Sequence, residues 1–286
     1  MDQTVFREQY EQSGYVVLPG FLPDTIVDGM RVAVERMVDS MASRLLDEGT
    51  IPQTFQDDPI ETRFLRVFQH DPDNASIQFS EELRVDAFFD LITYPDLLDL
   101  AGAVLGHEIR LAPGYFARPK AFPNKRFQSF WHQDPAYLLL GNQGFPRSAF
   151  DDIRIMNVWT PLVPVDRNNG CMQFLPGTHR DGMANHVPLP PHDYLEIERP
   201  ALDPCLAKGP IIDVALDPGD VVLFNTLLFH QGQDNHSDMV RWSLDFRFQD
   251  ARQPTLIDRE GHLLRSRVSP DSAVASRKEW QDLSPR

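Results

Sequence analysis

DPGDVVLFNTLLFH, residues 217–230, is the stretch that decides the fold class of this chain, because it combines a turn with apolar strand-like runs. Pro218 and Gly219 indicate the turn, and an apolar run follows them. A second apolar segment ends at His230. Helical patterns earlier in the chain followed by many short strands with Gly and Pro turns are typical of helices packed outside a sandwich or small barrel. The stretch therefore predicts a mainly β core that presents a histidine at the end of an apolar segment.

The next segment, MVRWSLDFRFQ at residues 239–249, alternates strictly between polar and apolar side chains. Successive side chains of a strand point to opposite faces, so the pattern predicts one strand with a buried face. The polar face carries Arg241, Ser243, Asp245 and Arg247, and the apolar face carries Trp242, Leu244, Phe246 and Phe248.

Two further side chains indicate a metal site. In FWHQD, His132 and Asp134 are two residues apart, so a strand projects both from the same side, while Gln133 points elsewhere. With His230 they supply two imidazoles and one carboxylate, which cover one face of an octahedron and leave three positions open. That is the ligand pattern of non-haem Fe(II) oxygenases. An H-x-D pair alone is common, but here Arg241 also follows His230 by eleven residues.

Several separate segments carry a family resemblance. They are GYVVLPGFLP (14–23), HQD (132–134), NVWTPL (157–162), NNGCMQFLPGTHRDG (168–182) and GDVVLFNTLLFH (219–230), followed by Arg241. From about residue 10 to about residue 250 the chain resembles the phytanoyl-CoA dioxygenase family of Fe(II)- and 2-oxoglutarate-dependent oxygenases. The resemblance narrows the predicted fold to a double-stranded β-helix, the jelly-roll core of cupin-like oxygenases. It is specific for family and chemistry and leaves the substrate open.

The resemblance implies a role for each matching residue. His132, Asp134 and His230 are the expected Fe(II) ligands, and 2-oxoglutarate and O2 are the expected cosubstrates. Arg241 offers a planar, charged fork suited to the distal carboxylate of 2-oxoglutarate. Ser243 lies on the same strand face and is expected to add a hydroxyl hydrogen bond.

Two residues of the strand IRIMNVWTPL are further candidates for the cosubstrate pocket. Trp159 matches the tryptophan of the family, and Asn157 shares its face by the two-residue period. Gln133 is expected only to support the site. His179 and the remaining histidines (70, 107, 186, 192, 236 and 262) have no partner at ligand spacing and are expected to be structural or exposed.

The expected reaction oxidises an unactivated C–H bond of a small-molecule metabolite, with release of succinate and CO2. Because Asp134 keeps a carboxylate where halogenases of this wider group carry a small residue, hydroxylation is favoured over halogenation. Desaturation, epoxidation and ring closure remain open. Expected substrate contacts are Tyr115, Arg118, Lys120, Arg126 and Tyr137, whose basic members suit a carboxylate or phosphate group such as that of an acyl-CoA. A small metabolite fits equally well.

A second hypothesis is a non-catalytic or differently metallated cupin-like binding protein. Imidazole and carboxylate ligands also suit zinc or nickel, so the ligand types alone do not identify iron. A pure binding protein, however, has little need for open coordination positions beside a carboxylate-binding arginine. The complete set of ligands with Arg241 therefore favours the enzyme.

The composition fits the enzyme hypothesis. A net charge of -15 argues against nucleic acid or an anionic membrane as a partner. The two cysteines, Cys171 and Cys205, supply neither a disulfide framework nor a zinc cluster and suit a reducing cytoplasm. Neither a signal peptide nor a transmembrane segment is expected. The sequence leaves the oligomeric state undetermined.

The chain is expected to form one domain over residues 1–286. Helices within about 1–106 should brace a jelly-roll core of about 107–250, followed by a C-terminal extension, 251–286. The expected elements are helices at 2–13, 24–46 and 94–105 and a strand at 15–18, and loops are expected near 141–150 and 183–210.

Overall fold

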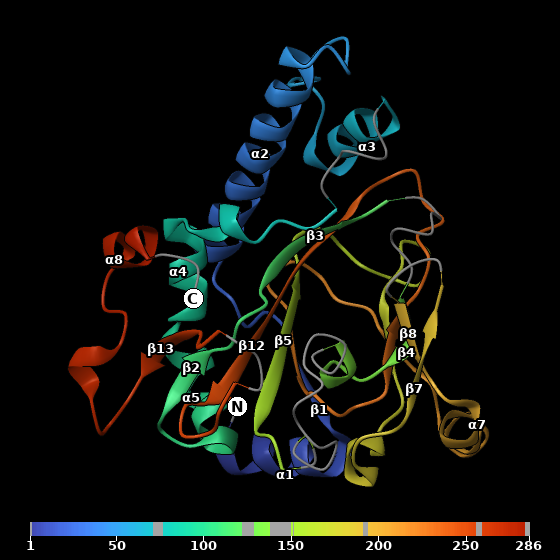
Figure 1. Cartoon of the computed structure of the whole chain (residues 1–286), viewed down its shortest axis with the longest axis vertical. Helices are drawn as coiled ribbons and strands as arrows, with labels where there is room; N and C mark the ends of the chain where they lie inside the picture. Colours follow the sequence, from blue (N-terminus) through green and yellow to red (C-terminus); the bar gives the residue numbers. More distant parts are fainter. Residues whose placement is uncertain are drawn as a thin grey trace.

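The computed structural model describes residues 2–70, 77–121, 129–137, 150, 152–190, 194–255 and 259–283. Its strands form two facing antiparallel sheets with helices packed outside them (Figure 1). The predicted jelly-roll class with flanking helices is confirmed.

The larger sheet has seven strands. Its order is β1 (Tyr15–Leu18), β10 (Val221–Asn225), β5 (Ile155–Pro161), β12 (Arg241–Asp250), β2 (Ile109–Leu111) and β13 (His262–Arg265), and β3 (Phe116–Lys120) also pairs with β12. The alternation predicted for residues 241–248 is the geometry of β12, whose apolar side chains Trp242, Leu244, Phe246 and Phe248 are fully buried.

The smaller sheet holds the histidine strands. Its order is β4 (Ser129–His132), β11 (His230–Gly232), β6 (Met172–Phe174) and β9 (Ile212–Val214). A separate hairpin joins β7 (His186–Leu189) to β8 (Tyr194–Ile197). Between the two sheets, Trp159 of β5, Phe174 of β6 and Phe224 of β10 belong to one buried cluster. This cluster lies in the space between the sheets, next to His230.

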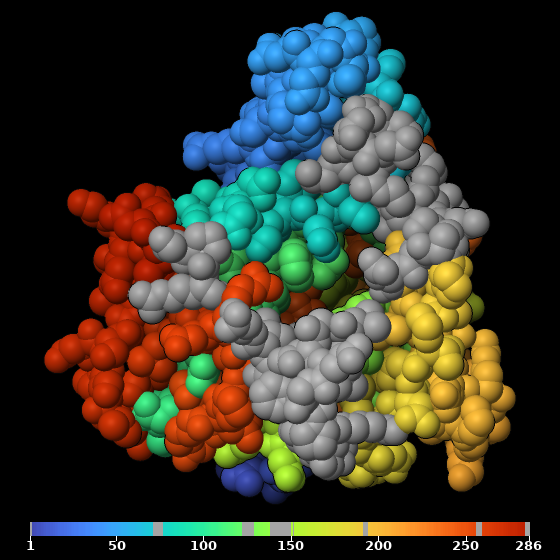
Figure 2. All heavy atoms as spheres, in the orientation of Figure 1, coloured from blue at the N-terminus to red at the C-terminus, as the bar shows by residue number. Residues whose placement is uncertain are grey.

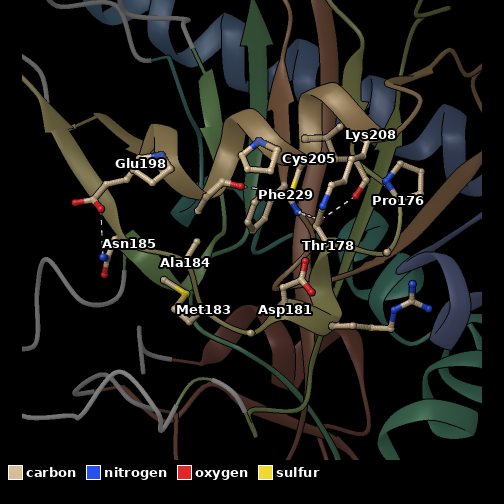
Figure 3. A pocket seen from close by; sticks show the side chains of 18 residues that line it. Pro176, Thr178, Asp181, Met183, Ala184, Asn185, Glu198, Cys205, Lys208 and Phe229 are labelled. Carbon is tan, nitrogen blue, oxygen red and sulfur yellow. Dashed lines mark hydrogen bonds between the residues drawn. The ribbon is translucent and has the colours of Figure 1, made fainter.

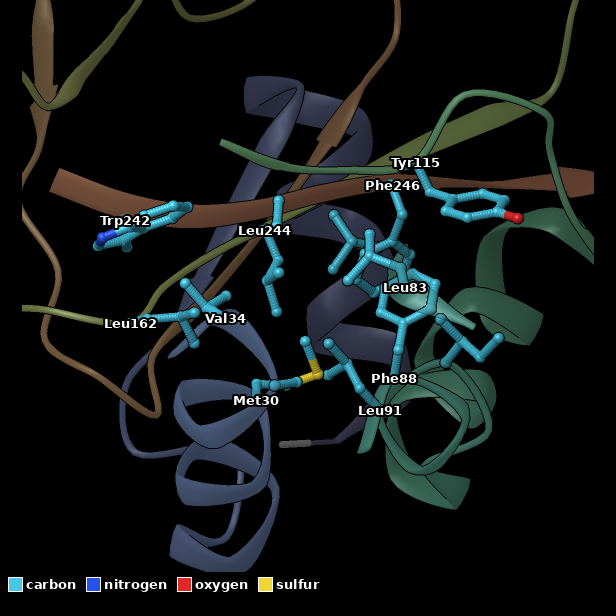
Figure 4. Close-up of a cluster of buried hydrophobic side chains, with 14 of the residues drawn as sticks. Met30, Val34, Leu83, Phe88, Leu91, Tyr115, Leu162, Trp242, Leu244 and Phe246 are labelled. Atoms are coloured by element: carbon cyan, nitrogen blue, oxygen red, sulfur yellow. The ribbon is translucent and has the colours of Figure 1, made fainter. Parts of the chain in front are cut away.

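Helices cover the outer face of the larger sheet. They are α1 (Gln3–Ser13), α2 (Asp24–Asp47), α3 (Ile60–His70), α4 (Asp86–Ile92), α5 (Pro95–Leu105) and α8 (Arg277–Asp282), with short 3-10 turns at Glu81–Leu83 and Pro270–Ser272. Figure 4 shows Met30 of α2 and Phe88 of α4 on the side of β12 that carries Leu244 and Phe246. Burial of these side chains fixes which face of β12 points inward to the site. None of the described helices is long and apolar enough to span a membrane.

The expected elements at the N-terminal side are confirmed: α1, β1, α2 and α5 lie within two residues of their predicted bounds. The expected loop at 183–210 is wrong, because it holds β7, β8 and α7 (Arg199–Lys208). Pro204 inside α7 disfavours a helix locally. Leu202 of α7, however, packs in one apolar cluster with Trp131 and Phe229, and this burial overrides the local preference.

The C-terminal residues add structure that the sequence analysis did not specify. β13 pairs with β2 and so extends the larger sheet. Trp280 of α8 is fully buried, and its indole Nε1 donates to the carbonyl of Leu83 at 3.1 Å. Figure 2 shows these residues (red) on one flank and the β7, β8 and α7 region (yellow to orange) on the opposite flank.

Candidate metal and cosubstrate site

Three predicted ligands converge between the sheets. His132 at the end of β4 and His230 at the start of β11 are direct partners in the smaller sheet, and Asp134 follows β4 by two residues. The Nε2 atoms of His132 and His230 lie 3.5 and 3.4 Å from Oδ1 of Asp134. All three ligand atoms lie within 4.8 Å of one another, so they can hold one metal ion.

Both histidines are held in the tautomer that a metal requires. Nδ1 of His132 contacts the carbonyl of Phe130 at 2.6 Å, and Nδ1 of His230 contacts the carbonyl of Leu228 at 2.9 Å. A carbonyl only accepts, so each Nδ1 carries the proton and each Nε2 offers its lone pair to the centre. Burial, with His230 nearby, lowers the pKa of His132 and so favours the neutral ligand form.

Asp134 is fixed by a residue to which the sequence analysis gave no role. Arg247 donates to Oδ2 of Asp134 from Nε at 3.1 Å and from Nη2 at 2.9 Å, which leaves Oδ1 toward the histidines. Burial alone would raise the pKa of Asp134, but the positive charge of Arg247 holds it well below its usual value. The ligand therefore stays ionised.

The ion pair between Arg247 and Asp134 is part of a network that also includes Asp245 and Arg118. Nη1 of Arg247 donates to Oδ1 of Asp245 at 2.7 Å and to the carbonyl of Gly114 at 2.9 Å. Oδ2 of Asp245 in turn accepts from Nε of Arg118. From the sequence alone, the alternation of residues 241–248 placed Asp245 and Arg247 on the same strand face as Arg241. This shared face is the signal that could have identified both residues as part of the site.

The polar face of β12 also carries the predicted cosubstrate residues. Arg241 and Ser243 are both buried, and Nε of Arg241 and Oγ of Ser243 have no hydrogen-bond partner. Burial lowers the pKa of Arg241 to about 10. Its guanidinium carbon lies 5.4 Å from the ring centroid of Trp159, within cation–π range.

Asn157 lies on β5 two residues before Trp159, and both of its side-chain polar atoms are buried and without a partner. Buried polar groups are normally paired, so these orphaned donors and acceptors mark space for a polar ligand. An anion that accepts from Arg241 and Ser243 would satisfy the unpaired Nε of Arg241 and the hydroxyl of Ser243. The residues present therefore fit both groups: the imidazole–carboxylate set fits a divalent transition metal, and the cationic pocket fits a carboxylate.

The expected substrate contacts separate into two groups. Lys120 and Arg118 lie opposite Arg241 and Ser243 in the pairing of β3 with β12, and so share the inner face. Tyr137 packs edge-on against His132, with ring centroids 5.3 Å apart. The prediction for Tyr115 is wrong, because its ring packs against Phe88 in the core outside the larger sheet. Arg126 lies outside the described residues.

Gln133, His179 and His186, which were expected to be supporting or structural residues, make hydrogen bonds with the backbone. Gln133 is fully buried and turned from the metal ligands; its Nε2 donates to the carbonyls of Gly182 and Leu227, and its Oε1 accepts from the backbone of Ala184. Nε2 of His179 contacts the carbonyl of Glu11, and Nε2 of His186 accepts from the backbone of Gln133. His192 lies outside the described residues.

A separate cavity of about 710 Å³ lies between α7 and the 3-10 turn η4 (Thr178–Asp181) (Figure 3). Its lining includes Phe229 and Cys205, while none of the described residues that line it belongs to the His–Asp–His cluster. Phe229, which lies directly before β11, lines this cavity, whereas His230 at the start of β11 belongs to the inner site.

Comparison with known proteins agrees with the geometry. The family model for phytanoyl-CoA dioxygenase (PhyH) matches residues 10–243. Phytanoyl-CoA dioxygenase from Rattus norvegicus is 32% identical over 256 residues, which are 85% of this chain and 67% of that protein. 1-Deoxypentalenic acid 11-beta-hydroxylase from Streptomyces arenae is 26% identical over 272 residues, 87% of this chain and 82% of that protein.

Among solved structures, EctD from S. alaskensis with 2-oxoglutarate and 5-hydroxyectoine has the same fold, with a TM-score of 0.60, 19% identity and coverage of 86% of this chain and 75% of that chain. The fold and site define a 2-oxoglutarate-dependent non-haem iron dioxygenase, with Fe(II) and 2-oxoglutarate as its cofactor and cosubstrate. The chain belongs to the phytanoyl-CoA dioxygenase family. This result favours the enzyme over the binding protein considered from sequence.

Proposed function

We propose that this dioxygenase oxidises an unactivated C–H bond of a small organic metabolite, and that the reaction is a hydroxylation. When bound, Fe(II) and 2-oxoglutarate supply the oxidation by O2, with release of succinate and CO2. The observation that carries the proposal is the cluster of His132, Asp134 and His230, whose ligand atoms lie within 4.8 Å of one another beside a pocket of orphaned polar groups.

Each residue of the site has a proposed task. The Nε2 atoms of His132 and His230 and Oδ1 of Asp134 hold the iron. Arg241 and Ser243 bind the distal carboxylate of 2-oxoglutarate through charge-assisted and neutral hydrogen bonds. Two imidazoles and one carboxylate would leave coordination positions of a bound iron open for the cosubstrate and O2.

Aromatic residues and Asn157 complete the proposed pocket. Phe224 packs 5.0 Å from the ring of His230, between centroids, and belongs to the same apolar cluster as Trp159. This lining excludes water from the reacting centre and so strengthens the polar contacts made there. Trp159 packs beside the cosubstrate, and Asn157 lines the same face.

The proposed substrate class follows from the relatives and from the site. The two relatives are named for a coenzyme A thioester and for a carboxylic acid, and both names describe small organic molecules. Asp134 retains a carboxylate, which supports hydroxylation. We further propose that residues 1–286 act as one dioxygenase domain, that neither nucleic acid nor a membrane is a partner, and that the enzyme works in the cytoplasm.

The test is an anaerobic titration of metal-free protein with Fe(II) and then 2-oxoglutarate, followed by the visible charge-transfer band of the chelate. We expect the band in the wild type and a loss of affinity of roughly tenfold or more in Arg241→Met, because a charge-assisted contact is removed. Arg44→Met, on the exposed side of α2, is the matched control.

Absence of the band in folded, iron-loaded protein would favour a binding protein without oxygenase chemistry. If the band appears, candidate substrates are screened by stimulated succinate release. A substrate that stimulates release is then identified with its product by mass spectrometry. A gain of one oxygen atom supports hydroxylation, whereas a loss of two hydrogens contradicts it.

A further inference from the structure

Asp245 of β12 bridges two arginines on the inner face of the larger sheet. Its Oδ1 accepts from Nη1 of Arg247 at 2.7 Å, and its Oδ2 accepts from Nε of Arg118. Both oxygens of the carboxylate are therefore engaged in charge-assisted hydrogen bonds. Rotation of the side chain would break at least one of these bonds, so Asp245 is held in one orientation.

The backbone beneath Asp245 is held on both sides. Asp245 lies opposite Trp159 of β5 on one side and opposite Phe116 of β3 on the other. A strand with two neighbours has its backbone fixed by two hydrogen-bond ladders. Arg247 follows on the same strand by two residues and so shares this face. The distance between Asp245 and Arg247 is thus set by the strand itself.

Arg118 is the outer support of this arrangement. Its Nη1 donates to Oε1 of Gln78 at 2.9 Å, and its guanidinium carbon lies 4.3 Å from the ring centroid of Phe116, within cation–π range. Its side chain is 37% exposed, whereas that of Asp245 is 12% exposed. Arg118 is therefore anchored at the rim of the site, and from there it holds Oδ2 of Asp245.

Arg247 uses separate edges of its guanidinium for its two carboxylate partners. Nε and Nη2 donate to Asp134, while Nη1 donates to Asp245 and to the carbonyl of Gly114. The guanidinium is planar and rigid, so fixing Nη1 also fixes the direction of the edge that faces Asp134. Burial lowers the pKa of Arg247, but Asp134 and Asp245 together raise it above its ordinary value.

We propose that Asp245 is a positioning residue of the metal site, and that it acts through Arg247 to hold Asp134 in place for iron. This inference rests on the proposed function, because it concerns the iron ligand of that same site. Among the described residues, the cluster of ligand atoms consists of His132, Asp134 and His230 and does not include Asp245. The role of Asp245 is therefore indirect.

Asp245 could influence iron by two physical routes that an experiment can separate. One route is the contact with Arg247, which sets the orientation of the Asp134 carboxylate. The other is the negative charge of Asp245, which attracts a cation through space without any contact. A double-mutant cycle separates them, because only the first route disappears when Arg247 is already replaced.

The test is an anaerobic Fe(II) titration of the wild type, Asp245→Asn, Arg247→Met and the variant with both substitutions. We expect Asp245→Asn to lower the affinity for Fe(II) about tenfold in the wild-type background, as groups that orient a metal ligand commonly do. In the Arg247→Met background, the same substitution should lower it by less than about twofold, because its route of action is gone.

Co(II) in place of iron provides a second measurement, since its visible absorption bands depend on the geometry of the ligands. We expect Asp245→Asn to shift these bands in the same direction as Arg247→Met does. A role in overall stability alone would lower resistance to urea and leave the bands of the folded protein unchanged. Asp28→Asn, at an exposed position of α2, is the control and should change neither affinity nor bands.

A variant that keeps the net charge decides the question if Asp245→Asn does not fold. Asp245→Asn combined with Arg118→Gln removes both charges of the outer ion pair. The route through space predicts an affinity for Fe(II) near that of the wild type, because the removed charges offset each other. The route through Arg247 predicts the same loss of about tenfold as in Asp245→Asn.

An equal loss of Fe(II) affinity from Asp245→Asn in both backgrounds would overturn the proposal, because Asp245 would then act by its charge alone. Unchanged affinity in folded Asp245→Asn would overturn it as well, while the proposed function would stand. Absence of the 2-oxoglutarate chelate band from wild type that binds Fe(II) would overturn the proposed function alone. Failure of the wild type to bind Fe(II) would overturn both.

Discussion

Arg247 donates two hydrogen bonds to one oxygen of Asp134, and the other oxygen of that carboxylate faces the two histidines. The guanidinium thereby orients the carboxylate and keeps it ionised. Groups that orient a metal ligand in this way affect metal binding strongly, although they never contact the metal.

Replacing Arg247 should therefore weaken iron binding. We expect Arg247→Met to lower the affinity for Fe(II) by about 10–100-fold, and Arg247→Lys to lower it less, because lysine keeps the charge but loses the planar fork. Anaerobic Fe(II) titration measures the effect, with Arg7→Met as an exposed control. Wild-type affinity in folded Arg247→Met would show that the carboxylate needs no such support.

Ser243→Ala should weaken binding of 2-oxoglutarate by a small factor. Its hydroxyl is buried without a partner, and a neutral hydrogen bond contributes about 0.5–1.5 kcal/mol, or roughly 2–10-fold in affinity. The chelate band gives the dissociation constant, and Ser43→Ala on an exposed position of α2 serves as control. If Ser243→Ala binds 2-oxoglutarate more tightly than the wild type does, Ser243 does not donate a hydrogen bond to this cosubstrate.

Gln133→Met should destabilise the fold while the metal ligands stay in place. The substitution leaves the backbone N–H of Ala184 and the carbonyls of Gly182 and Leu227 without their partner, at about 1–3 kcal/mol for each group left unpaired. Urea unfolding measures the stability, and Fe(II) titration measures the site.

The exposed substitution Gln9→Met is the control for this measurement. A folded Gln133→Met variant with unchanged stability that no longer binds Fe(II) would contradict the supporting role and indicate that Gln133 acts on the metal.

Trp242→Ala should cost roughly 3–5 kcal/mol of folding stability, because a large side chain leaves a packed core. Trp242 is fully buried on the outer face of β12, packs against Phe64 and donates from Nε1 to the carbonyl of Ile60 at 3.1 Å. Thermal or urea unfolding tests this, with Val268→Ala, 83% exposed, as control. A loss below 1 kcal/mol would mean that the core repacks around the gap.

Much of the site follows from local sequence, because strand geometry repeats every two residues. The period in 241–248 separates Arg241 and Ser243 from Trp242. Asp134 lies in a turn beyond the end of β4, so this turn, and not a continued strand, brings its carboxylate to His132. The same rule would have excluded Tyr115, since it precedes β3 by one residue and faces away from Phe116 and Arg118.

Sequence thus determined the three metal-ligand candidates and the polar face of β12, because these depend on short-range spacing and periodicity, and the resemblance of its motifs to a known family implied the jelly-roll class. Only the tertiary structure decided that Arg247 holds Asp134, 113 positions away, and that Lys120 lies opposite Arg241. Such contacts depend on which strands pair and in which register, and burial across the whole chain sets that register.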